Sequence, residues 1–252
     1  MSLNTIAGLA ISKVSLQEPS PNILIYGESG AGKTTLAGSA DAVPEMRKVL
    51  ILDIEGGTLS LKDRYPDVDS VRIKTWFDLQ QVYDELFAGG HGYRTIVLDS
   101  LTEAQKMSMD TVMRKLVEQH EERDADVPGI REWNINIEQT RKFVRALRDL
   151  PLTTIFTALA KQDKNQKTGV TKTKPSLSGK VADEVAGFLD IVAYLYTKEV
   201  DGEQRRMLLC GATQDHIAKD RTGKLEQVIQ DPTMATIWNA IKGLNNDATV
   251  EG

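Results

Sequence analysis

The chain has 252 residues, with 31 Lys and Arg against 36 Asp and Glu, for a formal net charge of −5. Its composition, 40% hydrophobic and 27% charged, is that of a globular domain. This excludes a disordered tail, a collagen-like chain and a disulfide-stapled secreted module. Cys210 is the one cysteine and has no partner for an internal disulfide, and no apolar run reaches the ~18 residues that span a membrane. The N-terminus also lacks the order of a signal peptide, so we expect a cytoplasmic protein.

Short β-branched runs alternate with longer helical stretches over the first 160 residues, a pattern typical of βαβ units and a parallel sheet. The runs are apolar throughout, as in strands covered on both faces, and they cover residues 22–26, 48–53, 71–73, 95–99 and 153–157. Helical patterns lie at 33–40, 76–87, 101–120 and 135–150.

The pattern changes after Lys180. A helix to about residue 189 is followed by two runs, 191–197 and 205–210, joined by a turn at Asp201–Gly202 that predicts an antiparallel hairpin. A last helix covers 233–242. We therefore expect an α/β fold: a mostly parallel central sheet flanked by helices, with an antiparallel C-terminal extension. The expected organisation is an N-terminal segment at 1–20, a single domain at 21–245 and a tail at 246–252.

The strand at 22–26 leads into a segment that matches the P-loop pattern G-x-x-x-x-G-K-[ST] and opens the next helix. In this pattern successive backbone N–H groups point into one concavity and the helix N-terminus adds partial positive charge, which predicts binding of a nucleoside triphosphate. Lys33 is expected to reach the β- and γ-phosphates, and the Thr34 hydroxyl to bind Mg²⁺. The expected nucleotide contacts are Gly27, Glu28, Ser29, Gly30, Ala31, Gly32, Lys33, Thr34 and Thr35.

The strand at 95–99 ends in Asp99, a carboxylate at the edge of the sheet where a P-loop protein holds its metal. Together with Thr34, Asp99 predicts octahedral oxygen coordination of Mg²⁺, directly or through water. The alternative is that Asp99 and Ser100 only cap the helix that starts at Leu101. The two roles are compatible.

Glu55 lies two residues beyond the strand that ends at Asp53, next to two glycines. A carboxylate beside the P-loop could orient or deprotonate the water that attacks the γ-phosphate; the alternative is an ordinary loop carboxylate. Residues 53–56 also have the D-x-x-G form of GTPases, and residues 160–163 resemble N-K-x-D. The first motif comes too early in the chain and the second lacks its Asn, so the GTPase interpretation is weaker.

The order of these motifs resembles the ATPase core of RecA-type recombinases: a P-loop, then D-x-E after the next strand, then a strand ending in Asp-Ser. The resemblance implies that Glu55 is the catalytic carboxylate and that Asp99 belongs to the Walker B strand. It also implies a mobile DNA-binding loop after the strand at 153–157.

Residues 161–180 follow that strand and hold six lysines and one aspartate, a net charge of +5, against −10 for the rest of the chain. No aromatic residue lies in this segment, so contact with a single strand there would rely on phosphates and depend strongly on salt. Its Lys, Thr and Gln content predicts that it is disordered without DNA. The expected DNA-binding residues are Lys161, Lys164, Lys167, Lys172, Lys174 and Lys180.

Lys219 and Arg221 form a K-x-R pair after the last expected strands. The pair is similar to the cations that RecA-like recombinases and hexameric helicases extend to the neighbouring subunit's γ-phosphate. The resemblance implies catalytic roles for both residues, acting in trans within a homo-oligomer, on charge that develops in the transition state. The alternative is a solvated turn rich in cations.

Five motifs together, at 27–34, 53–57, 98–100, 175–180 and 218–224, resemble the small phage-encoded ATP-binding proteins of the Sak type, also described as phage AAA-family nucleotide-binding proteins. These are RecA-core ATPases linked to single-strand annealing and recombination. The resemblance covers about residues 20–245 and implies a phage or prophage origin, ATP, Mg²⁺, single-stranded DNA and a single-strand-binding protein as partner. Two alternatives stay open: a nucleotide-gated loader with little hydrolysis, and a P-loop kinase of a small metabolite.

Overall fold

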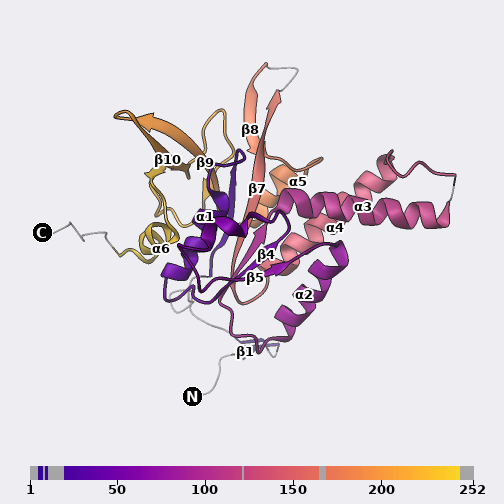
Figure 1. Ribbon diagram of the computed structural model, residues 1–252, viewed down its shortest axis with the longest axis horizontal. Coiled ribbons are helices and arrows are strands. Elements are labelled where there is room, and N and C mark those ends of the chain that lie inside the picture. The colour runs from indigo at the N-terminus through magenta and orange to yellow at the C-terminus, as the bar shows by residue number, and fades with distance from the viewer. Residues whose placement is uncertain (1–4, 8, 11–19, 121, 165–168, 245–252) are drawn as a thin grey trace, which may run out of the picture.

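A central sheet of ten strands organises the computed structural model, which describes residues 5–7, 9–10, 20–120, 122–164 and 169–244. Figure 1 shows helices packed on both faces of this sheet. In sheet order the strands are β12 (Val228–Gln230), β10 (Glu203–Leu209), β9 (Ile191–Val200), β3 (Asn22–Gly27), β7 (Thr153–Lys164), β6 (Thr95–Asp99), β4 (Val49–Asp53) and β5 (Asp69–Arg72).

The six strands from β9 to β5 are mutually parallel. β3, β4 and β6 are buried along their whole length, which agrees with their uninterrupted apolar sequences. Their carboxyl ends therefore meet at one edge of the sheet, where loops can bring polar side chains together. The predicted α/β fold, with its mostly parallel central sheet, is confirmed.

The antiparallel part consists of four strands. β10 pairs with β9 around a turn at Asp201–Gly202, and β12 pairs with β10, which confirms the predicted C-terminal extension. β11 (Lys219–Asp220) also pairs with β9, and β8 (Thr171–Pro175) pairs with β7.

The β7–β8 hairpin differs from the prediction for residues 161–180. β7 continues seven residues beyond Thr157, and residues 160–164 pair with 171–175 in an antiparallel ladder. The expected disorder is therefore wrong for these residues, because backbone pairing with β7 orders a polar sequence that has little apolar surface of its own. In Figure 1 the hairpin rises clear of the sheet.

Helices cover the two faces over two apolar clusters. One face carries α1 (Lys33–Gly38) and α6 (Met234–Lys242); the other carries α2 (Trp76–Ala88), α3 (Leu101–Gln119), α4 (Ile130–Arg148) and α5 (Val181–Phe188). Short 3₁₀ segments lie at Ser39–Ala42 and Gly57–Leu61, and β1 (Thr5–Ile6) pairs with β2 (Leu9–Ala10) away from the main sheet.

α3 and α4 lie side by side and project away from the sheet in Figure 1. α4 begins five residues earlier than predicted, because the Glu132 carboxylate accepts a hydrogen bond from the Gly129 N–H (2.9 Å) and so supports the first turn. None of the helices in the described ranges is long and apolar enough to cross a membrane.

Candidate functional site

The predicted P-loop joins the carboxyl end of β3 to the N-terminus of α1. Gly30 and Gly32 have φ values of 79° and 96°, which L side chains rarely adopt. A Cβ on Gly27 would lie 2.2 Å from the Leu195 carbonyl oxygen of β9, so this position also requires glycine. The loop is thus shaped by glycines at its ends and its turn, as a phosphate cradle requires.

Lys33 is buried at the first position of α1. Its Nζ donates hydrogen bonds to the carbonyl oxygens of Gly27 (3.1 Å) and Glu28 (2.9 Å), so the ammonium group lies over the loop. Burial lowers the pKa of Lys33, and the nearby carboxylates of Glu55, Asp99 and Glu28 oppose this shift. A bound polyphosphate would add negative charge here and favour the protonated lysine.

Thr34 and Asp99 meet at the carboxyl edge of the sheet, where the Thr34 hydroxyl donates to Asp99 Oδ2 (2.8 Å). Asp99 is almost fully buried, and its other carboxylate oxygen accepts a hydrogen bond from the Thr157 hydroxyl at the end of the predicted part of β7. A Cβ on Gly57 would lie 3.4 Å from both the Asp99 and Thr34 oxygens, so the backbone of Gly57 passes close to this pair.

This donor set fits Mg²⁺. A hydroxyl and a carboxylate are hard oxygen ligands, and Mg²⁺ is usually bound by one or two protein groups together with water and substrate phosphates. Within the described part of the chain, no group of three or more His, Cys, Asp or Glu side chains could hold a metal by itself. Thr34 and Asp99 would therefore hold the ion jointly with the nucleotide.

Glu55 is exposed and lies beside this pair, in the turn after β4. The turn is fixed by backbone bonding: the Ile54 N–H donates to the Asp99 carbonyl (2.8 Å), and the Asp53 carboxylate accepts from the N–H groups of Gly56 (2.7 Å) and Gly57 (3.3 Å). Asp53 also forms an ion pair with Arg72 (3.3 Å). The D-x-x-G pattern at 53–56 thus has a structural role in holding the turn that presents Glu55.

Ser100 connects Glu55 to the start of α3. Its hydroxyl donates a hydrogen bond to the Glu55 carboxylate, and its oxygen accepts from the Glu103 N–H (3.4 Å) as the N-cap of α3. Ser100 therefore caps α3, while the Asp99 carboxylate contacts Thr34 of the P-loop.

The predicted DNA-binding lysines have different surroundings. Lys161 donates to the Leu177 carbonyl, and burial together with neighbouring Lys174 lowers its pKa, while Asp163 and Asp183 oppose the shift. Lys174 pairs with Asp163 across the hairpin. Lys164 and Lys172 on the hairpin arms and Lys180 before α5 are exposed, whereas Lys167 lies outside the described residues.

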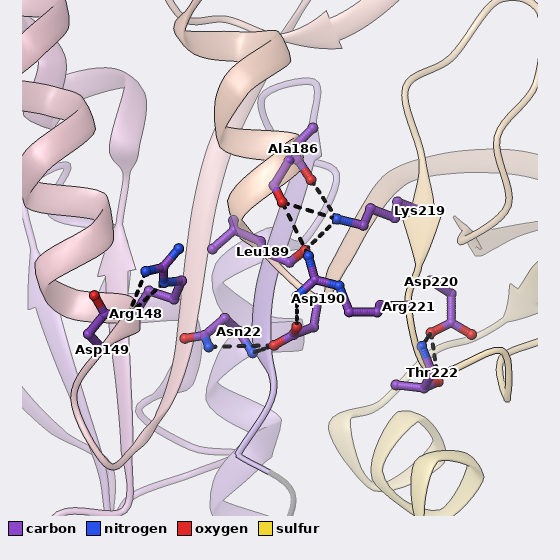
Figure 2. Close-up of polar contacts among 11 residues, drawn as sticks. Asn22, Arg148, Asp149, Ala186, Leu189, Asp190, Lys219, Asp220, Arg221 and Thr222 are labelled. Atoms are coloured by element: carbon purple, nitrogen blue, oxygen red, sulfur yellow. Dashed lines mark hydrogen bonds and ion pairs between the residues drawn. The ribbon is translucent and has the colours of Figure 1, made fainter. Parts of the chain in front are cut away.

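Lys219 and Arg221 pack on the C-terminal end of α5 (Figure 2). Lys219 Nζ donates to the carbonyl oxygens of Ala186 (3.1 Å), Gly187 (3.4 Å) and Leu189 (2.8 Å). Arg221 forms an ion pair with Asp190 (2.7 Å) and donates to the Gly187 carbonyl (3.2 Å). These cations thus satisfy free carbonyls at a helix end.

The K-x-R pair lies at the opposite edge of the sheet from the chain's own P-loop. Asp190, the partner of Arg221, accepts a hydrogen bond from the N–H of Asn22 (3.0 Å). Asn22 is the first residue of β3, whereas the P-loop follows the last, so the length of the strand, roughly 17 Å, separates them. The structure brings Lys33, Thr34, Glu55 and Asp99 together and leaves the K-x-R pair outside that group.

Two further site residues carry no local sequence signal. Thr157 reaches Asp99 only because β7 lies between β3 and β6 in the sheet. Arg206, on β10, places its Nε 2.8 Å from the position that a Cβ on Gly32 would take. With Thr35 and Tyr65 it lines a cavity of about 150 Å³ beside the N-terminus of α1.

Two solved structures are similar in fold. One is a KaiC-like protein from the hyperthermophilic archaeon Pyrococcus horikoshii OT3, with 19% identity, a TM-score of 0.46, and coverage of 75% of this chain and 77% of that one. The other is the flagellar accessory protein FlaH from Methanocaldococcus jannaschii, with 12% identity, a TM-score of 0.47 and 84% coverage of both chains. Comparison with curated proteins finds no significant match.

The sequence profile of the AAA domain family matches residues 20–222. This range contains the P-loop, the strand that ends in Asp99 and the K-x-R pair. The match agrees with the geometry at the carboxyl edge of the sheet, where a P-loop, a buried lysine and a threonine–aspartate pair converge. The chain belongs to the AAA domain family and is a nucleotide-binding P-loop protein.

Proposed function

We propose that the chain is a Mg²⁺-dependent ATPase that acts on single-stranded DNA in phage recombination or single-strand annealing. The observation that carries the enzymatic part is the convergence of Glu55 with the Thr34–Asp99 pair beside the P-loop. A site for binding alone needs the P-loop and the metal ligands. A carboxylate fixed by a buried serine, next to the metal ligands, is in addition suited to hydrolysis.

In this proposal Glu55 orients a water molecule and takes its proton as the water oxygen attacks the γ-phosphorus. The bond from the γ-phosphorus to the bridging oxygen breaks, and ADP leaves with that oxygen. Lys33 stabilises the charge on the β- and γ-phosphate oxygens, and Thr34 and Asp99 would hold Mg²⁺. When bound, the ion neutralises charge on the same oxygens.

The hairpin lysines support the DNA part of the proposal. β7 passes the P-loop, with Leu159 paired to Gly27, before it enters the hairpin. Lys164 and Lys172 are exposed on the two arms and offer positive charge to a phosphate backbone. A strand bound there would contact a hairpin that is continuous with a strand of the nucleotide site.

The in-trans role of Lys219 and Arg221 belongs to the same proposal. Because these residues lie far from their own P-loop, they could act on a nucleotide only in a neighbouring subunit of a homo-oligomer. A single-strand-binding protein as partner and action in the cytoplasm of a bacterial host complete the proposed setting.

Turnover of ATP by the wild type and by Glu55→Gln tests the enzymatic part, with ATP binding measured on both proteins. We expect Glu55→Gln to bind ATP with Mg²⁺ and to lose at least about 100-fold in kcat. Tight binding with slow turnover that the substitution leaves unchanged would instead favour the loader. ADP formed together with a phosphorylated metabolite, and without DNA, would favour the kinase.

A further inference from the structure

A cavity of about 570 Å³ lies outside the P-loop site, between α3, α4 and the segment that follows the β7–β8 hairpin. Ile54 and Thr102 are among its lining residues, and Ile54 directly precedes Glu55 in the turn after β4. Lys161, at the base of the hairpin, forms part of its wall. The cavity is therefore next to the proposed path of a single strand.

Trp133 of α4 lines this cavity and is 38% exposed. Trp76 and Trp238 are buried, at 5% and 4%. Among the residues that the structure describes, no aromatic ring or cationic group stacks on Trp133. Part of the indole surface of Trp133 is therefore accessible beside the cavity, where a second ring could stack on it.

Gln105 of α3 also lines the cavity, and its relative exposure is only 4%. Its side-chain oxygen accepts a hydrogen bond from the Ser178 N–H (2.7 Å), which fixes the orientation of the amide. The Nε2 group has no hydrogen-bond partner. A buried amide donor without a partner is rare in native proteins.

The charge around the cavity suits an anionic ligand. Lys74, Lys106 and Lys161 line it, against Glu103 and Asp110. Glu103 pairs with Lys106 (2.6 Å), while Lys74 is exposed. An aromatic face and lysines around one cavity are groups that bind the base and phosphate of a nucleotide.

We propose that this cavity, the α3–α4 pocket, takes one nucleotide unit of the single strand that the hairpin binds, with its base stacked on Trp133. The lysines contact the flanking phosphates. The pocket supplies the stacking platform that residues 161–180 lack. This inference rests on the proposed action on single-stranded DNA.

The test uses the full chain and an oligothymidylate of about 20 nucleotides, with an abasic strand of equal length as reference. We expect Trp133→Ala to lower affinity for oligothymidylate about tenfold and to leave affinity for the abasic strand unchanged. Trp133→Phe keeps a ring and should retain most of the affinity. Phe77→Ala, at an exposed aromatic residue of α2 that does not line the pocket, is the matched control and should bind as the wild type.

Tryptophan fluorescence gives a second readout. Oligothymidylate should quench the wild type more than Trp133→Phe, since the other two tryptophans are buried. If free thymidine monophosphate quenches the wild type at the same nucleotide concentration as the oligomer, the pocket binds free nucleotides and the strand assignment is wrong.

The outcomes separate the pocket from the proposed function. If the wild type binds oligothymidylate and Trp133→Ala binds it equally well, the pocket assignment is overturned and the DNA proposal stands. If the wild type binds neither strand at low salt, the DNA proposal itself fails, and the strand assignment fails with it.

Discussion

The hydroxyl of Ser100, the first residue after β6, donates a hydrogen bond to the carboxylate of Glu55, in the turn after β4. Ser100 is fully buried and is also the N-cap of α3, whereas Glu55 is exposed. A residue fixed by the fold thus holds the proposed general base toward the Thr34–Asp99 pair. The two functions of Ser100, capping and positioning, can be separated by measurement.

Ser100→Ala is expected to lower kcat about tenfold with little change in KM, because Glu55 loses its orienting donor and the P-loop is untouched. The same substitution should destabilise the fold by about 1 kcal/mol through loss of the cap. Ser100→Thr retains the hydroxyl and should recover most of the turnover. Wild-type kcat in Ser100→Ala would show that this hydrogen bond has no role in turnover.

The lowered pKa of Lys33 predicts that the affinity for ATP falls at alkaline pH. Burial holds the pKa of Lys33 below 10.5, and the protonated form is the one that binds phosphate. Affinity for ATP is therefore full below the lowered pKa and should begin to fall at a pH below the ordinary lysine range. Titration of ATP affinity between about pH 7 and pH 10.5 measures this limit.

Glu28→Gln provides the matched variant for that titration. The Glu28 carboxylate raises the pKa of Lys33, so its removal should move the alkaline limit to lower pH. An identical pH profile in the variant would contradict the coupling between these two residues.

We predict that the Cys210 thiol is unreactive in the native protein. It is buried at the end of β10, and burial, with a smaller effect of Asp220, raises its pKa to about 12. A disulfide exchange reagent at pH 8 should therefore react only as fast as the protein opens. Stoichiometric reaction within the mixing time, with the fold intact by circular dichroism, would show that the thiol is accessible.

Arg221→Ala separates the helix-end role of the K-x-R pair from the in-trans role. Arg221 is about half exposed, so loss of its pair with Asp190 should cost less than about 1 kcal/mol of stability. If it acts in trans, its loss should lower turnover by about 1000-fold. A stable variant with wild-type turnover would leave only the helix-end role.

Mixing of two inactive variants tests the in-trans role without reference to stability. Lys33→Ala subunits keep the K-x-R pair and Arg221→Ala subunits keep the P-loop, so mixed oligomers would contain intact composite sites. Turnover of the mixture above that of either variant alone is the expected result. No recovery at any ratio, with oligomers demonstrated, would contradict a shared site.

Much of the fold could be predicted from the sequence because the parallel strands are buried on both faces. β3, β4 and β6 are continuous apolar runs whose ends differ from the predicted limits by one residue at most. β8 could not be predicted, because residues 171–175 are polar and become a strand only by pairing with β7. These residues show no alternation of apolar and polar side chains from which a strand could be predicted.

Only some residues of the candidate site could likewise be predicted from the sequence. The P-loop and Asp99 have a fixed spacing along the chain, so the sequence predicts them. Thr157 and Arg206 approach the site, and Trp133 comes to line the α3–α4 pocket, only through strand order and helix packing, which local sequence does not encode. The contact of Lys219 with the end of α5 could not be predicted from the sequence either, since it joins residues 30 or more positions apart.

Steady-state ATP hydrolysis with Mg²⁺, with and without single-stranded DNA, at about 50 mM and about 200 mM salt, is the most direct test of the proposed function. We predict stimulation by DNA at low salt that fades at the higher salt, because lysine–phosphate contacts on the hairpin release counterions. The double variant Lys164→Gln and Lys172→Gln should weaken that stimulation while ATP turnover without DNA stays at the wild-type rate. Turnover that DNA leaves unchanged at both salt concentrations would contradict action on single-stranded DNA.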